Sequence, residues 1–294
     1  MTIGGSSRRV LEECDAMAQA TETTHGILEP QTGRAHFTLT RRSPSDDLAG
    51  HVACHWIVRW DLRGGAPFTQ EILPHPCVNL VAEPGLIAVY GIPLGRSPHR
   101  LEAAGVAIGT KFRPGGFGGF LACPASDLND RAVALGELFG ADGGRLQDEL
   151  ATLDGAEDEH IEVVEQFLRE RLPAPDPRYE LVRAVVDAML HAGPGTTVAE
   201  LAEQHAVSPR TLQRAFSDFV GVGPKWVLKR YRMHEAAERI AAGEAGDGAS
   251  LALDLGYFDQ SHFIRDFTAQ IGVPPSVYER ACAAAAGRPV HAPV

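Results

Sequence analysis

Two short segments of this chain repeat one pattern of residues at an interval of 51 positions. The first, SPRTLQRAFSDFVGVGP, covers 208–224, and the second, DQSHFIRDFTAQIGVPP, covers 259–275. Each opens on Ser or Asp, whose side-chain oxygen can accept hydrogen bonds from the free amides of a helix start. Apolar residues then recur at spacings of three and four, and both segments close on Gly-Val-x-Pro. The repeat predicts two similar helices, each stopped by the same turn.

A shorter helix precedes each repeated segment. Leu201-Ala202 in the first unit matches Leu251-Ala252 in the second, at an interval of 50, so the second turn is one residue longer. The small alanine side chains allow two helices to pack closely. A short helix, a tight turn and a capped second helix form a helix-turn-helix, whose second helix enters the major groove of DNA.

The polar face of each second helix carries side chains suited to reading bases. An Arg/Gln face on a lone helix would more often be simply solvated, but the matched caps, Arg and turns favour DNA recognition. Arg and Gln form bidentate hydrogen bonds with guanine and adenine edges. A long helix predicted over 224–243 would hold the two units so that one chain reads successive major-groove faces, about 34–36 Å apart. The predicted DNA-facing residues are Pro209, Arg210, Gln213 and Arg214 in the first unit, and Gln260, Ser261, Ile264 and Arg265 in the second.

The segment from about Tyr179 to Ala283 resembles the DNA-binding domain of the AraC/XylS family of bacterial transcription regulators. The resemblance rests on TVAELAEQHAVSPRTLQRAF, GVGPKWVLKRYRMHEAAERI and LGYFDQSHFIRDFTAQIGVPPSVY. It implies a rigid connection between the units, and duplex DNA as partner. It leaves RNA polymerase and a second copy of the chain open as further partners. The base-facing positions that it implies are Arg210, Gln213, Arg214, Gln260, Ser261 and Arg265.

Basic residues near the start of the long helix are candidates for phosphate contacts. Lys225, Lys229 and Arg230 lie there, although a basic helix face is more often just solvated. The net charge of −11 is unusual for a DNA-binding chain. Residues 1–177 hold 15 basic against 25 acidic side chains, and residues 178–283 hold 11 against 13. The acidity therefore belongs to the N-terminal part.

The N-terminal half has the texture of a β-rich domain with flanking helices. Short β-branched and aromatic runs such as HVACHWIVRWDL (51–62) alternate with Gly and Pro turns, and strand–helix alternation is absent. The predicted fold class is α+β, a β-barrel or sandwich followed by an all-α domain. The predicted organisation is a flexible arm (1–36), a β-rich effector or oligomerisation domain (37–172), a Pro-rich linker (173–178), the DNA-binding domain (179–283) and a disordered tail (284–294).

Chemistry in the N-terminal half is only weakly indicated. HWIVRWDL, EILPHPCVNLV and KFRPGGF are similar to the uncharacterised β-rich domain that precedes such DNA-binding domains, which implies a sensory or oligomerising role. KFRPGGFGGF could cradle an anion, but a strand-end loop is the simpler interpretation. No cofactor or metal site is predicted, because zinc-type spacing is absent. The candidate effector pocket consists of Trp56, His75, Asn79 and Arg113.

The sequence thus predicts a transcription regulator in the cytoplasm that is not an enzyme and has no membrane partner. No apolar run approaches the roughly 18 residues of a membrane helix, and the five scattered cysteines are typical of reduced thiols. Two alternatives stay open. One is a β-domain enzyme tethered to DNA, and the other is a constitutive DNA-binding protein whose N-terminal domain only oligomerises.

Overall fold

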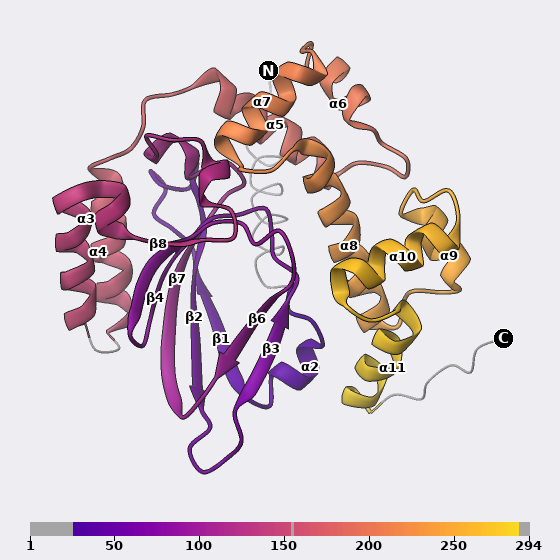
Figure 1. The fold of residues 1–294 in the computed structure, drawn as a ribbon, viewed down its shortest axis with the longest axis horizontal. Coiled ribbons are helices and arrows are strands. Elements are labelled where there is room, and N and C mark those ends of the chain that lie inside the picture. The colour runs from indigo at the N-terminus through magenta and orange to yellow at the C-terminus, as the bar shows by residue number, and fades with distance from the viewer. Residues whose placement is uncertain (1–25, 154–155, 288–294) are drawn as a thin grey trace, which may run out of the picture.

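The computed structural model describes residues 26–153 and 156–287. The N-terminal domain is built on a six-stranded antiparallel sheet in the order β1-β2-β7-β4-β5-β8, with β3 and β6 as a separate pair (Figure 1). The strands are β1 (Phe37–Arg42), β2 (Val52–Asp61), β3 (Phe68–Ile72), β4 (Asn79–Glu83), β5 (Leu86–Tyr90), β6 (Ser97–Leu101), β7 (Ala104–Phe112) and β8 (Ala132–Ala134).

Two helices cover one face of this sheet, away from the helical domain (Figure 1). They are α3 (Leu135–Thr152) and α4 (Glu157–Arg169), and short 3-10 turns, η1 (Gly118–Phe120) and η2 (Ala125–Leu128), precede them. The core beneath is apolar, with Leu80, Phe112 and Phe117 almost wholly buried. Alternate residues of the inner strands face α3 and α4, because side chains on a strand alternate between its two sides.

The C-terminal domain is entirely helical within the described residues. Its helices are α5 (Pro177–Leu190), α6 (Val198–Gln204), α7 (Pro209–Phe219), α8 (Pro224–Ala242), α9 (Gly248–Asp254), α10 (Gln260–Ile271) and α11 (Pro275–Ala285). Two apolar cores lie along α8. One gathers α5, α6 and α7 around the first half of α8, and the other gathers α9, α10 and α11 around the second half. The predicted α+β architecture, with two helix-turn-helix units joined by a long helix, is confirmed.

The structure differs from the sequence-based prediction at the N-terminal arm. Residues 1–25 of that arm lie outside the described residues, but 26–36 are folded. Ile27 forms a β-bridge with Ile72, Leu28 is buried, and α2 (Pro30–Gly33) contacts α11. Two adjacent apolar residues, Ile27 and Leu28, are too few to show the periodicity of a helix or a strand. Their packing partners lie far along the chain, so the sequence did not predict this part of the fold. At the other end, Ala284 and Ala285 of the predicted tail belong to α11, and 288–294 lie outside the described residues.

The segment LNDRAVALGELFG (128–140) has the apolar spacing of a helix, but the structure forms a strand within it. Residues 132–134 form strand β8, with Val133 buried at the edge of the sheet, and the helix begins at Leu135. Residues 173–176 of the predicted Pro-rich linker lie outside helices and strands, whereas its last two residues, Pro177 and Arg178, already belong to α5. Among the helices of the described ranges, none is both long and apolar enough to cross a membrane.

The two domains meet along α5, α7 and α8, and also where α2 contacts α11. Tyr179 at the start of α5 donates a hydrogen bond of 2.6 Å from its hydroxyl to the carbonyl oxygen of Gly50, and its ring stacks on His51 at 5.0 Å. The Gly-rich loop after β7 lies against α7. A side chain at Gly118 would come within 2.7 Å of the Phe219 backbone, so this glycine permits the contact. That loop is therefore a domain contact in this structure.

Candidate nucleic-acid interface

The first helix-turn-helix places its second helix, α7, with one face buried and one face open. The hydroxyl of Ser208 accepts a 3.0 Å hydrogen bond from the amide of Thr211, and Pro209 begins the helix. Proline costs nothing there, because the first amides have no partner within the helix. The buried residues of α7 are Leu212, Ala215, Phe216 and Phe219, and the predicted DNA-facing residues Pro209, Arg210, Gln213 and Arg214 are all exposed.

The second unit repeats this arrangement in α10. Asp259 accepts a 2.7 Å hydrogen bond from the amide of His262. The buried residues are Phe263, Phe267 and Ile271, and the predicted DNA-facing residues Gln260, Ser261, Ile264 and Arg265 are exposed. The guanidinium Nε of Arg265 reaches back to the Ser261 carbonyl oxygen at 3.4 Å. All eight predicted positions are thus at the surface.

The repeated Gly-Val-x-Pro turn has a backbone reason. Gly221 after α7 has φ 98°, and Gly272 after α10 has φ 95°, a left-handed conformation that other residues adopt only at a cost. The turns inside the two units differ. Gly256 takes φ 74° in the second unit, whereas Ala206 takes φ 54° in the first. Ala206 therefore carries backbone strain at a position where the second unit has glycine.

Helix α8 sets the spacing of the two recognition helices. It has 19 residues, which corresponds to about 28 Å at the α-helical rise. In Figure 1, α7 lies beside the start of α8 and α10 beside its second half. Lys229 on α8 forms a 2.8 Å ion pair with Asp266 on α10, and Arg239 forms another of 2.8 Å with Asp254 on α9.

Direct contacts also join the two units. Arg232 on α8 donates a 2.8 Å hydrogen bond to the carbonyl oxygen of Thr196, in the loop before α6. A side chain at Gly256 would come within 2.3 Å of the Gly195 amide nitrogen, so the second unit's turn lies against the first unit's entry loop. These contacts fix the orientation of α7 relative to α10.

The three predicted phosphate-contact residues lie in different environments. Lys225 is exposed, and Lys229 is half-buried in its ion pair with Asp266. Arg230 is 2% exposed, with its guanidinium over the Trp226 ring at 4.3 Å and 3.4 Å from the Leu94 carbonyl oxygen of the N-terminal domain. Burial lowers the pKa of Arg230 to about 10. The structure thus places Arg230 in the domain interface. The sequence did not predict this, because the packing of one domain on the other leaves no local pattern in the sequence.

The second helix-turn-helix has a surface feature that was not predicted from the sequence. Phe258, in the turn before α10, is 90% exposed, and Leu253 at the end of α9 is also exposed. Two apolar side chains therefore project from the second helix-turn-helix beside its recognition helix. The only available signal was the extra residue in the second turn, GYFD compared with AVS.

The predicted effector residues do not form one group. Trp56 donates a 3.2 Å hydrogen bond from its indole nitrogen to the Asn79 side-chain oxygen. Arg113 instead donates from Nε to the carbonyl oxygen of Ala49 at 2.6 Å. His75 stacks on His234 of α8 at 4.1 Å, in the domain interface. The structure brings Trp56 and Asn79 into contact, whereas Arg113 and His75 have other partners.

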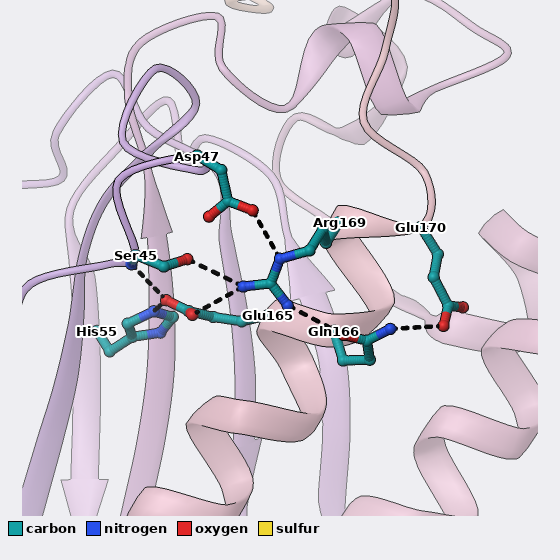
Figure 2. Close-up of polar contacts among 7 residues, drawn as sticks. All are labelled: Ser45, Asp47, His55, Glu165, Gln166, Arg169 and Glu170. Atoms are coloured by element: carbon teal, nitrogen blue, oxygen red, sulfur yellow. Dashed lines mark hydrogen bonds and ion pairs between the residues drawn. The ribbon is translucent and has the colours of Figure 1, made fainter.

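Sequence reasoning missed a buried polar network between the sheet and α4 (Figure 2). His55 is wholly buried, with Nε2 3.0 Å from a Glu165 oxygen and Nδ1 2.9 Å from the Thr110 hydroxyl. A carboxylate only accepts, so the neutral ring donates from Nε2 and accepts at Nδ1. Burial lowers the pKa of His55, although Glu165 opposes this shift.

The network continues from Glu165 into the β1–β2 loop. Burial opposes ionisation of Glu165, but hydrogen bonds from Ser45 and His55 outweigh it and lower its pKa. Arg169 bridges Glu165 at 3.6 Å and Asp47 at 2.6 Å, and the Ser45 amide donates to Glu165 at 2.9 Å (Figure 2). The same loop carries Gly50 and His51, which contact Tyr179. Within the described residues, no group of three or more His, Cys, Asp or Glu side chains could hold a metal ion.

Comparisons with known proteins agree with this geometry. The model of a helix-turn-helix domain family matches residues 201–281. An AraC-like transcription regulator of Streptomyces lividans is 39% identical over 93 residues, which is 31% of this chain and 30% of that protein. Residues 201–281 thus match a helix-turn-helix domain family, and the chain is similar over part of its length to an AraC-like regulator. The predicted resemblance of the C-terminal part is confirmed.

Other matches concern parts of the chain. The transcriptional activator RhrA of Rhizobium meliloti is 31% identical over 111 residues, 38% of this chain and 35% of that protein. The C-terminal domain of AraT, a response regulator from Geobacillus stearothermophilus, is 27% identical, with a TM-score of 0.33, over 36% of this chain and 85% of that one. Residues 40–134 match a domain of unknown function, DUF6597. The chain thus spans about a third of the length of the curated relatives that it matches.

Proposed function

We propose that this protein is a sequence-specific DNA-binding transcription regulator, controlled through its N-terminal domain. The observation that carries the proposal is the pair of capped helices, α7 and α10, with their predicted base-reading residues exposed on a rigidly connected frame. Duplex DNA in the cytoplasm is the proposed partner, and RNA polymerase at the bound promoter is the proposed target of regulation. The relatives support this role, since they are transcription regulators.

Control by the N-terminal domain is supported by where the two domains touch. Asn129 hydrogen-bonds the carbonyl oxygen of Gly221, directly after α7. The β1–β2 loop contacts α5 through Gly50 and His51. A ligand shifts an equilibrium only through different affinities for two states. Any change in these contacts would move the first recognition helix relative to the N-terminal domain, and so alter DNA binding.

The decisive experiment is a selection of genomic fragments by the purified full chain, run beside an Arg214→Ala/Arg265→Ala double variant at matched salt. A recurring site with two half-motifs, absent from the variant's selection, is the expected result. Arg280→Ala is the matched control, because Arg280 is an exposed arginine on α11 and belongs to neither recognition helix. Equal enrichment by wild type and the double variant would show that these helices do not read DNA.

A further inference from the structure

A groove of about 1340 Å³ opens between the sheet and the α3–α4 pair. Its apolar walls come from Ile87, Val106 and Ile108 on the strands and from Leu150 and Leu153 at the end of α3. The groove lies on the α4 side of the sheet, since His55, Ile57 and Arg59 alternate along β2 and both His55 and Arg59 contact α4. Trp56 points to the opposite side.

His160 on α4 is a polar side chain in this apolar setting. It lines the groove and is 4% exposed, and neither of its ring nitrogens has a hydrogen-bond partner among the described residues. Leaving a buried donor or acceptor without a partner costs about 1–3 kcal/mol. Burial, and then the neighbouring His55, lower the pKa of His160, so its ring is neutral near pH 7. A neutral imidazole offers one donor and one acceptor.

The charges around the groove oppose an anionic ligand. Asp61, Glu83 and Asp148 line it, against Arg34 and Arg59. Arg59 is paired with Glu157 at 2.6 Å, and Asp61 is paired with Arg63, which leaves Glu83 and Asp148 against Arg34. Neither the neutral ring nor these side chains provides a free cation deep in the groove for a carboxylate or phosphate.

We propose that this groove binds an uncharged, mainly apolar small molecule whose hydroxyl or carbonyl group hydrogen-bonds His160. The apolar walls would cover the body of the ligand, and the ring nitrogen would gain the partner it lacks. Apolar side chains form part of the lining and charged residues another part. An apolar wall beside a few convergent polar groups is typical of small-molecule sites.

This site deepens the proposed function by naming a class of effector, and its regulatory part rests on that function. His160 neighbours His55, and the chain of contacts from His55 through Glu165 and Arg169 reaches the β1–β2 loop (Figure 2). That loop holds Tyr179 of the DNA-binding domain. A ligand that moves α4 would therefore change the contacts of the β1–β2 loop at the domain interface.

The test measures binding by isothermal titration calorimetry with the full chain and no DNA. The probes are 2-naphthol, 2-naphthoate and 2-naphthylmethylammonium, which share one skeleton and differ in charge. Wild type should bind 2-naphthol at least tenfold more tightly than either ion. Failure of 2-naphthol to bind at millimolar concentration, or tighter binding of either ion, would overturn the proposal. DNA is absent from this measurement, so the proposed ligand site can be refuted or supported independently of the proposed regulator function.

Substitutions at two positions of the groove locate the site. Val106→Trp should fill the groove and abolish binding, and Val277→Trp, at an exposed position of α11, is the matched control. His160→Phe should weaken 2-naphthol binding about tenfold, and His160→Gln, which keeps a donor and an acceptor, should retain most of it. Unchanged affinity in Val106→Trp would show that the probe binds elsewhere and would refute the site, even if the His160 variants fail to fold.

Discussion

Asn129 of the N-terminal domain donates a 2.7 Å hydrogen bond from its side-chain nitrogen to the carbonyl oxygen of Gly221. Gly221 ends the first recognition helix in a left-handed conformation. A side chain at Gly221 would approach the Asn129 oxygen to 2.9 Å and the Ala125 carbonyl oxygen to 3.0 Å. The glycine thus serves two purposes, since it stops α7 and admits the N-terminal domain to the end of that helix.

Asn129→Ala should weaken the hold of the N-terminal domain on α7. It removes one partly buried hydrogen bond and leaves the Gly221 carbonyl without that donor, which predicts a loss of about 1 kcal/mol in the free energy of unfolding. DNA affinity should change as well, because the end of the recognition helix is released. Chemical denaturation and a DNA-binding titration check both. Asp127→Ala, on the exposed side of η2, should change neither.

The recognition helices could be predicted from the sequence, but their docking to the N-terminal domain could not. Ser208, Asp259 and the turn glycines act within a few residues of themselves, so their pattern is local and was predictable. Asn129 and Gly221 are 92 positions apart, and Tyr179 and Gly50 are 129 apart. Side chains of ordinary appearance acquire such partners only when the domains pack, so no spacing in the sequence marks them.

Arg214→Ala and Arg265→Ala should each weaken specific DNA binding by about 1–3 kcal/mol, the value of one bidentate base contact. The two helices lie along α8, so each substitution should relax base selection at a different position, about one helical turn of DNA apart. Selection of randomised sites with each single variant measures this. Relaxation of the same base position by both variants would contradict the two-unit arrangement.

Ala206→Gly should stabilise the C-terminal domain by about 0.5–1 kcal/mol, because glycine adopts a positive φ without the steric cost that alanine has. The gain is partly offset by the greater freedom of glycine in the unfolded chain. Thermal and urea unfolding measure the change. Ala242→Gly, at an exposed helical position in α8, should instead destabilise. A loss of stability in Ala206→Gly would mean that the turn does not hold the observed φ of 54°.

The N-terminal sheet should lose stability as the pH falls below neutrality. His55 and His160 have lowered pKa values in the folded protein, mainly because both are buried. The unfolded chain therefore binds protons first, at about pH 6.5, and protonation favours unfolding. Stability should be full above that pH and should decline as the pH falls toward the folded pKa values. Urea unfolding between neutrality and mild acid measures this decline, and His160→Phe should make it shallower. A decline of equal slope in His160→Phe would show that His160 contributes no pH dependence.

Arg230→Met distinguishes two roles for this arginine. As a phosphate contact it would be needed for DNA affinity, but the structure buries it between Trp226 and Leu94, with no ion-pair partner in the described part of the chain. A buried charge without a carboxylate is costly, so Arg230→Met, which keeps an apolar stem of similar length, should raise the free energy of unfolding by about 1 kcal/mol or more. Exposed Lys225 provides the contrast, since Lys225→Met should leave stability unchanged and lower the salt dependence of DNA binding by about one phosphate contact. Denaturation and salt-titrated DNA binding of both variants check these outcomes. A fall in the salt dependence of Arg230→Met equal to that of Lys225→Met would place Arg230 on the DNA after all.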